Sequence, residues 1–279
     1  MSQITASQVK ELRTITNVGM MECKKALQDT NGDLEAAIKL LRERGLAVAA
    51  KKADRAANEG LIEIAVSADG KTGAMVEVNC ETDFVAKNEN FQAFVADLAQ
   101  KGLAVGDNEL AAAEKDNLAF KVSEIGENLV INRNATYTVQ GEGAIGKYIH
   151  LGGKVGVMVE IGCENAANSG SDALVELGKE VALHVAAASP AALTRDGLPS
   201  ELVESERALY AKQVEGKPAN IIEKILDGKL SKFYSQVVLL EQGFVKDPDI
   251  TVQALVDKTA KDLGDTLSVR RYVRYQIGG

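Results

Sequence analysis

The side chains most able to do chemistry in this chain are two histidines and three cysteines, and they are scattered. His150 and His184 lie in no HExxH-like frame that would place two imidazoles on one metal ion. Cys23, Cys80 and Cys163 form no CxxC pair and have no histidine beside them. Neither a zinc site nor a disulfide framework is therefore indicated. We expect reduced, mostly buried thiols that pack as small hydrophobic groups.

One glycine motif resembles the end of a phosphate-binding loop. Gly70-Lys71-Thr72 fits the last three residues of GxxxxGK[ST], but Ala65 replaces the first glycine of that pattern. The motif also joins two strand-like runs, whereas a phosphate-binding loop opens a helix. The sequence contains no GxSxG motif, paired catalytic carboxylates or dinucleotide-binding loop. It predicts a scaffold with contact surfaces, not an enzyme, and neither a metal nor a cofactor.

Charge and hydropathy argue against further classes. The chain carries a net charge of −8, which argues against nucleic acid as the main ligand because nucleic-acid-binding proteins usually carry a strong basic patch. No apolar run reaches the roughly 18 residues typical of a membrane span. Residues 1–13 lack the basic and apolar regions of a secretory signal. We expect a cytoplasmic protein that binds no membrane and no nucleic acid directly.

The elements that position these residues begin with three short helices. Thr5 and Gln8 have the spacing of a capping box at the start of the first helix. Asp33 is predicted to cap the third helix, and Gly45 is predicted to end it. The basic, Ala-rich residues 47–60 that follow are expected to form a solvated helix and a linker. The three helices together predict a compact bundle similar to the ubiquitin-associated fold.

Two adjacent methionines stand between the first two helices. Met20 and Met21 cannot both face one core, because neighbouring helix positions point about 100° apart. One of them is expected to be exposed, where the flexible side chain of methionine suits an adaptable contact surface. The alternative is that Met21 belongs to the core and Met20 lies at its edge.

An internal repeat organises the middle of the chain. Residues 70–82, GKTGAMVEVNCET, recur without a gap as residues 153–165, GKVGVMVEIGCEN, which indicates two related structural units. Each copy alternates like a strand, follows another alternating run across a glycine turn, and precedes a helix. Two antiparallel hairpins with packed helices predict an α+β architecture. The residues expected to share one strand face are Ala74, Val76, Val78 and Cys80, and Val157, Val159, Ile161 and Cys163; the helix stripes are Phe91, Phe94, Val95 and Leu98, and Leu174, Leu177, Val181 and Val185.

Further segments complete the predicted fold. Residues 108–128 read as helical and residues 135–141 as a strand. Residues 200–242 are predicted to form an antiparallel helical hairpin, joined around Gly216-Lys217-Pro218, that interrupts the second unit and projects from it. The C-terminal run is predicted to be a strand, with one side formed by Val269, Arg271, Val273, Tyr275 and Ile277.

The helical hairpin has apolar residues beyond those that a pair of helices needs. Ile221, Ile222 and Ile225 make it a candidate for self-association. The alternative is that the hairpin folds back on its own body.

Three stretches closely resemble the bacterial translation elongation factor Ts family, and the resemblance covers nearly the whole chain in order. They are ITASQVKELRTITNVGMMECKKALQDTNGDLEAAIKLLRERG, VNCETDFVAKN and GKPANIIEKILDGKLSKF. The resemblance implies an α+β fold with a ubiquitin-associated-like N-terminal domain, two related core subdomains and an inserted helical hairpin. The expected units are residues 1–55 (helical domain and linker), 56–140 (first core subdomain), 141–188 (start of the second), 189–242 (inserted hairpin) and 243–279 (end of the second).

The same resemblance implies a function and a set of contact residues. Members of the family are nucleotide-exchange factors for elongation factor Tu. They bind its GDP-bound and nucleotide-free forms, displace Mg²⁺ and promote GDP release without covalent chemistry, so that GTP can rebind. By resemblance, the segment that enters the partner and displaces the metal is Thr82, Asp83, Phe84 and Val85, and further contacts are Met20, Met21 and His150.

Other roles stay open on the sequence alone. The helical hairpin could join two copies of the chain. The N-terminal domain could serve unrelated partners, including recruitment as a subunit of a viral RNA replicase, which is a known use of this family. A thiol enzyme using Cys80 or Cys163 is disfavoured, because both lie on the apolar face of a strand.

The repeat bears on the role of Phe84. Asp83 and Phe84 align with Ala166 and Ala167 in the second copy, which builds the same strand exit without an aromatic residue. A structural need common to both copies therefore does not explain Phe84, and an outward, functional role is predicted. Asp83 is expected to cap its own short helix, contact the partner, or do both.

Overall fold

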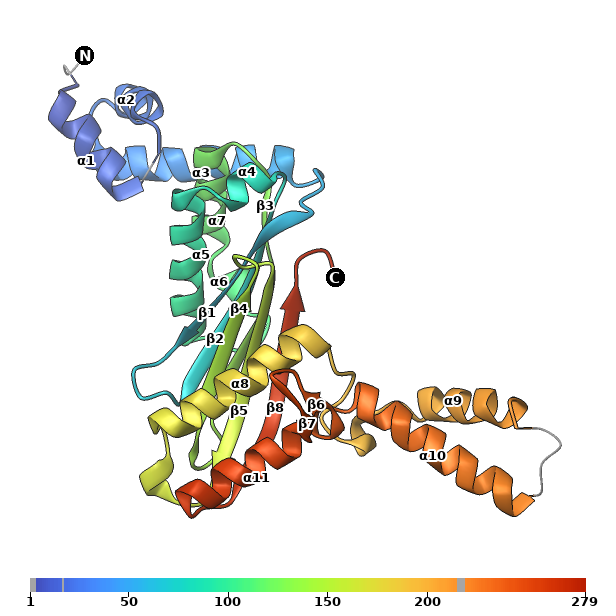
Figure 1. The fold of residues 1–279 in the computed structure, drawn as a ribbon. Coiled ribbons are helices and arrows are strands. Elements are labelled where there is room, and N and C mark those ends of the chain that lie inside the picture. The colour runs from blue at the N-terminus through green and yellow to red at the C-terminus, as the bar shows by residue number, and fades with distance from the viewer. Residues whose placement is uncertain (1–3, 17, 215–218) are drawn as a thin grey trace.

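The computed structural model describes residues 4–16, 18–214 and 219–279. It combines helices with antiparallel sheets, in agreement with the predicted α+β class. Figure 1 shows an elongated body with a helical bundle at one end and a pair of helices that projects from the other.

The N-terminal bundle contains the three expected helices, α1 (Ala6–Thr16), α2 (Met20–Asp29) and α3 (Leu34–Lys52). The capping box forms as predicted, since the Thr5 backbone N–H donates to Gln8 Oε1 at 3.0 Å and the Gln8 N–H donates to Thr5 Oγ at 3.3 Å. Asp33 caps α3 by accepting from the Ala36 N–H at 3.0 Å. The bundle core is Val9, Leu12, Val18, Cys23, Ala26, Leu27, Ala37 and Leu41.

The prediction that Gly45 ends the third helix is wrong, because α3 continues to Lys52. Helix α7 (Lys115–Ile125) packs along this part of α3, and a Cβ on Gly45 would lie 3.5 Å from the carbonyl oxygen of Ala119. A glycine that ends a helix usually adopts positive φ, but Gly45 does not. Packing against α7 therefore outweighs the weak helix propensity of glycine.

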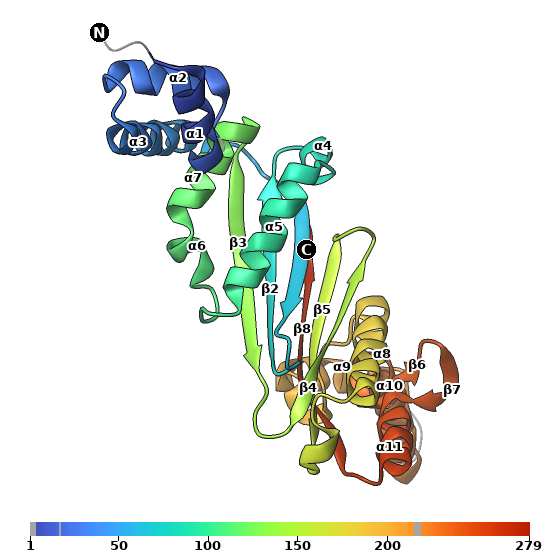
Figure 2. The same ribbon diagram turned by 90° about the vertical axis from the view of Figure 1, so that its left-hand side faces the viewer.

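Three strands form the first sheet in the order β1–β2–β3, and all neighbours are antiparallel. They are β1 (Glu59–Val66), β2 (Thr72–Cys80) and β3 (Leu129–Thr138), so the last strand begins earlier than its sequence pattern indicated. Helix α5 (Glu89–Gly102) lies against this sheet (Figure 2). The short helices α4 (Asp83–Ala86) and α6 (Leu110–Ala113) complete the unit.

The second sheet has the order β4–β5–β8 and is also antiparallel. Its strands are β4 (Gly143–His150), β5 (Val155–Cys163) and β8 (Leu267–Gln276), and its helices are α8 (Asp172–Ala188) and α11 (Val252–Leu263). Three single-turn 3₁₀ helices, η1 (Ala166–Asn168), η2 (Arg195–Gly197) and η3 (Leu239–Glu241), and the small hairpin β6 (Gly243–Phe244) and β7 (Asp247–Thr251) lie between them.

The two sheets pack face to face, with helices on their outer sides. The predicted faces of β2 and β5 turn toward α5 and α8, while Met75 and Met158 point into the layer between the sheets. Two repeat-equivalent glycines permit this close approach. A Cβ on Gly73 would lie 2.6 Å from Met158 Sδ, and a Cβ on Gly156 would lie 2.5 Å from Ile62 Cγ2.

The prediction that one side of the C-terminal strand runs unbroken from Val269 to Ile277 is wrong. Arg271 pairs with Glu160 and Val269 pairs with Ile161, so the ladder has a bulge at Arg270. A bulge moves the residues beyond it to the other face. Val269 therefore joins the core beside α8, whereas Val273, Tyr275 and Ile277 face the other sheet.

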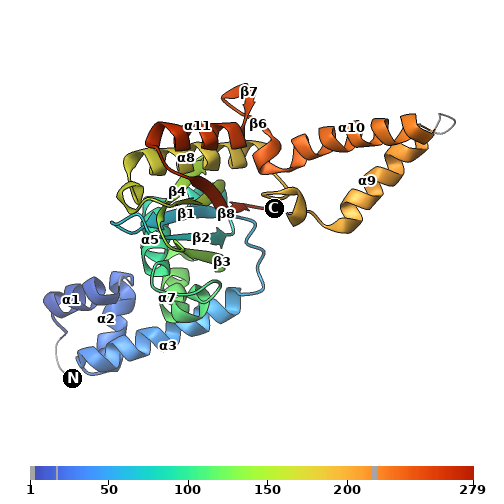
Figure 3. The ribbon, with the colours of Figure 1, turned by 90° about the horizontal axis from the view of Figure 1, so that it is seen from below.

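Helices α9 (Ser200–Lys212) and α10 (Ala219–Val237) form the projecting pair, which extends away from the sheets (Figure 3). The predicted join at 216–218 lies outside the described residues. At the base of the pair, Leu198, Phe233 and Val238 are buried together. Farther along α10, Ile221 is 44% exposed, while Ile222 and Ile225 are half-buried.

Candidate functional site

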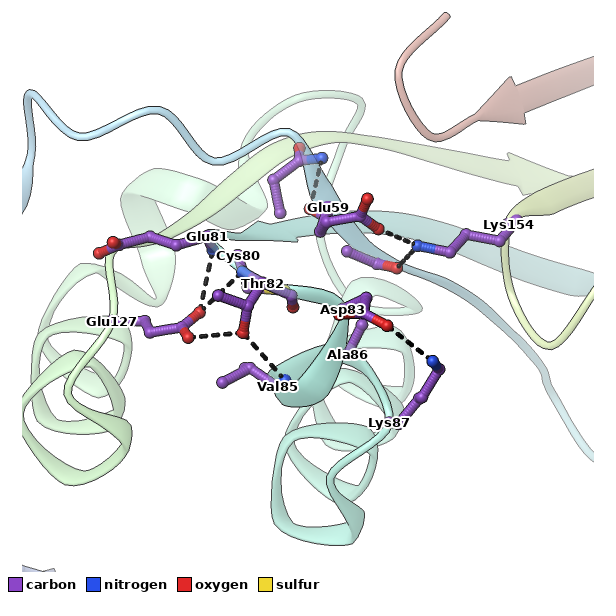
Figure 4. A network of polar contacts seen from close by, with 12 residues as sticks. Glu59, Cys80, Glu81, Thr82, Asp83, Val85, Ala86, Lys87, Glu127 and Lys154 are labelled. Carbon is purple, nitrogen blue, oxygen red and sulfur yellow. Dashed lines mark hydrogen bonds and ion pairs between the residues drawn. The ribbon is translucent and has the colours of Figure 1, made fainter.

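The strand exit after β2 is built around Thr82. Its backbone is extended, and its hydroxyl accepts from the Val85 N–H at 3.3 Å, so Thr82 is the N-cap of α4. Of the alternatives for Asp83, the one in which it caps this helix is therefore wrong, because Asp83 is its first helical residue. The Asp83 carboxylate instead accepts from Lys87 Nζ at 2.7 Å (Figure 4), and this bond lowers the pKa of Asp83 below its ordinary value.

Phe84 projects from this short helix into solvent with 80% of its surface exposed. A helix of four residues has room to bury only one side. That side is Ala86, which is buried, together with the half-buried Val85, which packs on the core beneath α5. Phe91 and Phe94 in α5 are buried in the same core. Phe91 and Phe94 thus belong to the core of this unit, whereas Phe84 is exposed to solvent.

One carboxylate that the sequence analysis did not single out holds this strand exit. Glu127 Oε2 accepts from the backbone N–H groups of Glu81 and Thr82, both at 3.0 Å. Glu127 Oε1 accepts from the Thr82 hydroxyl at 2.6 Å. In return, Glu81 Oε1 accepts from the Asn128 N–H at 2.6 Å. A sequence signal for it is the preceding Gly126, which ends α7 in the left-handed conformation.

The second copy of the repeat builds the same exit with different side chains. Asn165 caps η1 by accepting from the Ala167 N–H at 3.0 Å. The Asp265 carboxylate accepts from the N–H groups of Glu164 and Asn165, both at 3.1 Å. Asp265 follows Gly264, which ends α11 as Gly126 ends α7. The frame is therefore duplicated, but the position of Phe84 holds an alanine.

His150 lies at the end of β4, where its Nδ1 is 3.1 Å from the Tyr148 hydroxyl and the two rings stack. The next residue, Leu151, is 70% exposed and has a φ of 50°. Such a conformation is unusual for leucine, and sequence reasoning missed this residue although it stands directly before two glycines. The turn between β4 and β5 lies beside the strand exit that follows β2. Lys154 Nζ in this turn lies 2.5 Å from Glu59 Oε2 (Figure 4), and Glu59 pairs with Cys80, the last residue of β2.

Met20 and Met21 begin α2 and are both exposed, at 49% and 74%. The helix buries its other side through Cys23, Ala26 and Leu27, so the alternative that placed Met21 in the core is wrong. Helix α2 lies in the N-terminal bundle, apart from α4 (Figures 1 and 2). The structure therefore brings the hairpin of His150 close to the Thr82–Val85 segment, but not the two methionines.

The remaining reactive groups are buried. Burial raises the pKa values of Cys23 and Cys163, and it raises that of Cys80 to about 11. A thiolate at these positions is therefore disfavoured at neutral pH. Within the described residues, no group of three or more histidine, cysteine or acidic side chains is placed to hold a metal ion. None of the described helices has the length and hydropathy that crossing a membrane requires.

Comparison with known proteins identifies the family. Residues 81–279 match the family described as Elongation factor TS. The elongation factor Ts of Trichlorobacter lovleyi is 46% identical over 291 residues, which cover 99% of this chain and 93% of that protein. The chain belongs to the elongation factor Ts family.

Two other relatives show the same extent of similarity. The elongation factor Ts of Nitratidesulfovibrio vulgaris is 45% identical, covering 99% of this chain and 96% of that protein. That of Clostridioides difficile is 46% identical, covering 100% and 94%. The resemblance carried by the three sequence stretches is thus confirmed, and the chain is a member of a family of translation elongation factors.

Proposed function

We propose that this member of the elongation factor Ts family is a guanine-nucleotide exchange factor. It binds elongation factor Tu in its GDP-bound and nucleotide-free forms, displaces Mg²⁺ and promotes GDP release so that GTP rebinds. The observation that carries this proposal is Phe84, a large aromatic side chain that is 80% exposed on a hydrogen-bonded helical turn. Family membership supplies the partner, and the exposed ring supplies an anchor of the kind that dominates interfaces.

The mechanism needs no covalent step. Mg²⁺ requires near-ideal octahedral geometry. A side chain that displaces one of the partner groups around the metal therefore weakens the binding of both the metal and the nucleotide. Binding is also reciprocal: if this chain prefers the nucleotide-free partner, the complex must bind nucleotide more weakly by the same factor. Exchange is then a matter of differential affinity, and no acid, base or nucleophile of this chain takes part.

The proposed contact residues have different roles that depend on where they lie. Thr82 and Val85 hold the short helix to the body, while Asp83 and Phe84 face outward and make the contact. Met20, Met21 and His150 add contacts on two other elements, and exposed Leu151 extends the contact at His150. All three regions present apolar surface to solvent, and scattered anchors on separate elements suit a partner that must be held while one of its sites is distorted.

The architecture supports this arrangement. We assign α1–α3 to a ubiquitin-associated-like contact domain within residues 1–55, and the two sheets with their helices to related core subdomains within residues 56–140 and within 141–188 plus 243–279. The projecting helices α9 and α10, within residues 189–242, are the candidate site for pairing with a second copy through Ile221. The exchange reaction belongs in the cytoplasm, where translation takes place.

The test is the release of a fluorescent GDP analogue from elongation factor Tu, with and without this chain. We expect the wild-type chain to accelerate release, and Phe84→Ala to lose at least about tenfold of that acceleration, as for an interface hot spot. Val245→Ala is the matched control, because Val245 is an apolar side chain that is 43% exposed outside the proposed contacts.

The outcomes separate two parts of the proposal. If the wild-type chain left the release rate unchanged, the exchange function would be wrong. If Phe84→Ala stimulated release as well as Val245→Ala does, the exchange function would stand, but the role of the exposed ring would not.

A further inference from the structure

We propose that Glu127 is the positioning residue for Phe84, and that its carboxylate sets the direction in which the aromatic ring leaves the body. This inference rests on the proposed exchange function. Glu127 lies two residues before β3 and far from Phe84 in the sequence, yet it makes three hydrogen bonds to the strand exit that leads into α4. It does not itself belong to the segment that contacts the partner.

The hydrogen bonds form a chain from Glu127 to α4 (Figure 4). A carboxylate only accepts, so the Thr82 hydroxyl must give its single proton to Glu127 Oε1, at 2.6 Å. The lone pairs of that hydroxyl then face away, and one of them accepts from the Val85 N–H at 3.3 Å. The cap of α4 is therefore oriented by Glu127, and Phe84 lies inside the turn that the cap closes.

Helix α4 depends on this support because it is too short to be stable alone. It has four residues, far below the roughly 12 that an isolated helix needs in water. The Asp83–Lys87 ion pair is largely exposed, and such pairs contribute little. The buried attachments are Ala86 and part of Val85. They hold one side of the turn, while the backbone entering it is held by Glu127.

The attachment is also reciprocal. Glu127 accepts from the backbone of Glu81, and Glu81 Oε1 accepts from the backbone of Asn128. Arg55 Nη1 lies 3.4 Å from the same Glu81 oxygen. Each of the two segments thus supplies both a carboxylate and an N–H group to the other. Such an arrangement resists sliding of the β2 exit along the start of β3.

The second copy of the repeat supplies a natural control. Asp265 binds the two equivalent backbone N–H groups, and its Oδ2 accepts from Asn168 Nδ2 at 2.8 Å. The helical turn there carries the exposed alanines 166 and 167. Asp265 therefore makes the same kind of backbone attachment as Glu127 but presents no aromatic side chain.

The experiment compares Glu127→Ala, Asp265→Ala, Phe84→Ala and the Phe84→Ala/Glu127→Ala double variant in GDP release from elongation factor Tu. We expect Glu127→Ala to lose stimulation on the order of tenfold, equivalent to one strong interaction. Asp265→Ala should stay within about twofold of wild type. Glu127→Gln keeps an acceptor for the backbone N–H groups and should fall between wild type and Glu127→Ala.

The double variant distinguishes positioning from a general loss of structure. If Glu127 acts through Phe84, the double variant should be no slower than Phe84→Ala alone, because residues that act as a unit are not additive. If the two losses multiplied, or if Glu127→Ala behaved like Asp265→Ala while Phe84→Ala was impaired, the inference would be overturned.

A second measurement needs no partner and so separates this inference from the proposed function. In the free protein, hydrogen exchange at the amides of Glu81, Thr82 and Val85 should speed up in Glu127→Ala and stay unchanged in Asp265→Ala. Even if the wild-type chain released no GDP from elongation factor Tu, unchanged exchange at these amides in Glu127→Ala would refute the positioning role.

Discussion

The guanidinium group of Arg133 in β3 lies over the ring of Tyr275 in β8, with its central carbon 4.1 Å from the ring centre. The reverse pair is also present, since Arg271 in β8 lies 3.9 Å from the ring centre of Tyr137 in β3. Each sheet thus inserts an arginine over a tyrosine of the other. The two sheets are joined by an exchanged pair of cation–π contacts, which is what two related units facing each other would form.

The same arginines neutralise two buried acids. Glu77 is 2% exposed and accepts from Arg133, and Glu160 is 0% exposed and accepts from Arg271. The β-bulges lie beside these two glutamates at equivalent places in the repeat. The relationship between the units therefore extends to β3 and β8, beyond the 70–82 and 153–165 segments in which the sequence repeat is visible.

Replacing Arg133 should destabilise the fold. Arg133→Met leaves the Glu77 carboxylate buried without its ion-pair partner, which costs about 3 kcal/mol in the free energy of unfolding. Adding Glu77→Met should restore much of that loss, because the buried charge is then gone. Urea denaturation measures both variants. Arg207→Met, on the exposed side of α9, is the control, and an equally small effect at Arg133 would contradict the importance of this pair.

The stability of the protein should fall in mild acid because of His184. This histidine is 1% exposed; its Nδ1 accepts from the Val245 N–H at 3.1 Å and its Nε2 lies 2.9 Å from Gln242 Oε1. Burial lowers the pKa of His184, so the unfolded chain, with an ordinary pKa of about 6.5, binds the proton first. The stabilisation is present above that value and is lost as pH falls toward the folded pKa, by up to about 1.4 kcal/mol per pH unit.

Comparison with His184→Gln isolates this effect from the titration of carboxylates. The difference in unfolding free energy between wild type and variant should shrink from pH 7.5 to pH 5.0. A difference that stays constant over this interval would mean that His184 is not the group responsible.

Replacing Gly156 and Gly228 by alanine should change the stability of the protein in opposite directions. Gly156→Ala places a Cβ 2.5 Å from Ile62 Cγ2 in the layer between the sheets, and overpacking of this kind costs about 1–3 kcal/mol. Gly228 lies exposed within α10 with no atom within 4 Å of the added Cβ. Gly228→Ala should therefore raise stability by about 0.5–1 kcal/mol through helix propensity. Thermal unfolding of both variants checks the signs, and a stabilised Gly156→Ala would show that the sheets can separate without cost.

Phe84 should matter to function without mattering to stability. Phe84→Ala removes a side chain that is already 80% exposed, so its free energy of unfolding should lie within about 0.5 kcal/mol of wild type. Phe91→Ala empties a fully buried site and should cost about 3–5 kcal/mol. Chemical denaturation of both variants tests the contrast. A large loss of stability in Phe84→Ala would mean that the exposed ring packs on its own chain.

Local features were predictable from the sequence, and features that depend on distant packing were not. The caps at Thr5 and Asp33 were predicted because their partners are three residues away. The end of α3 was misplaced at Gly45 because α7, which extends it, is encoded about seventy residues later. The face of β8 was misassigned because the bulge at Arg270 leaves no mark on the alternation of apolar residues.

The candidate site divides in the same way. The sequence by itself determined that residues 70–82 and 153–165 form equivalent strands, and that Phe84 has no counterpart in the second copy. Alternation relates neighbouring residues, and a repeat appears when the sequence is aligned with itself, so neither needs a contact in space to be seen. Only the tertiary structure decided that Thr82, and not Asp83, caps α4, that Glu127 holds this cap, and that Arg133 meets Tyr275. These contacts join residues from separate segments, and their geometry exists only once the two sheets have packed together.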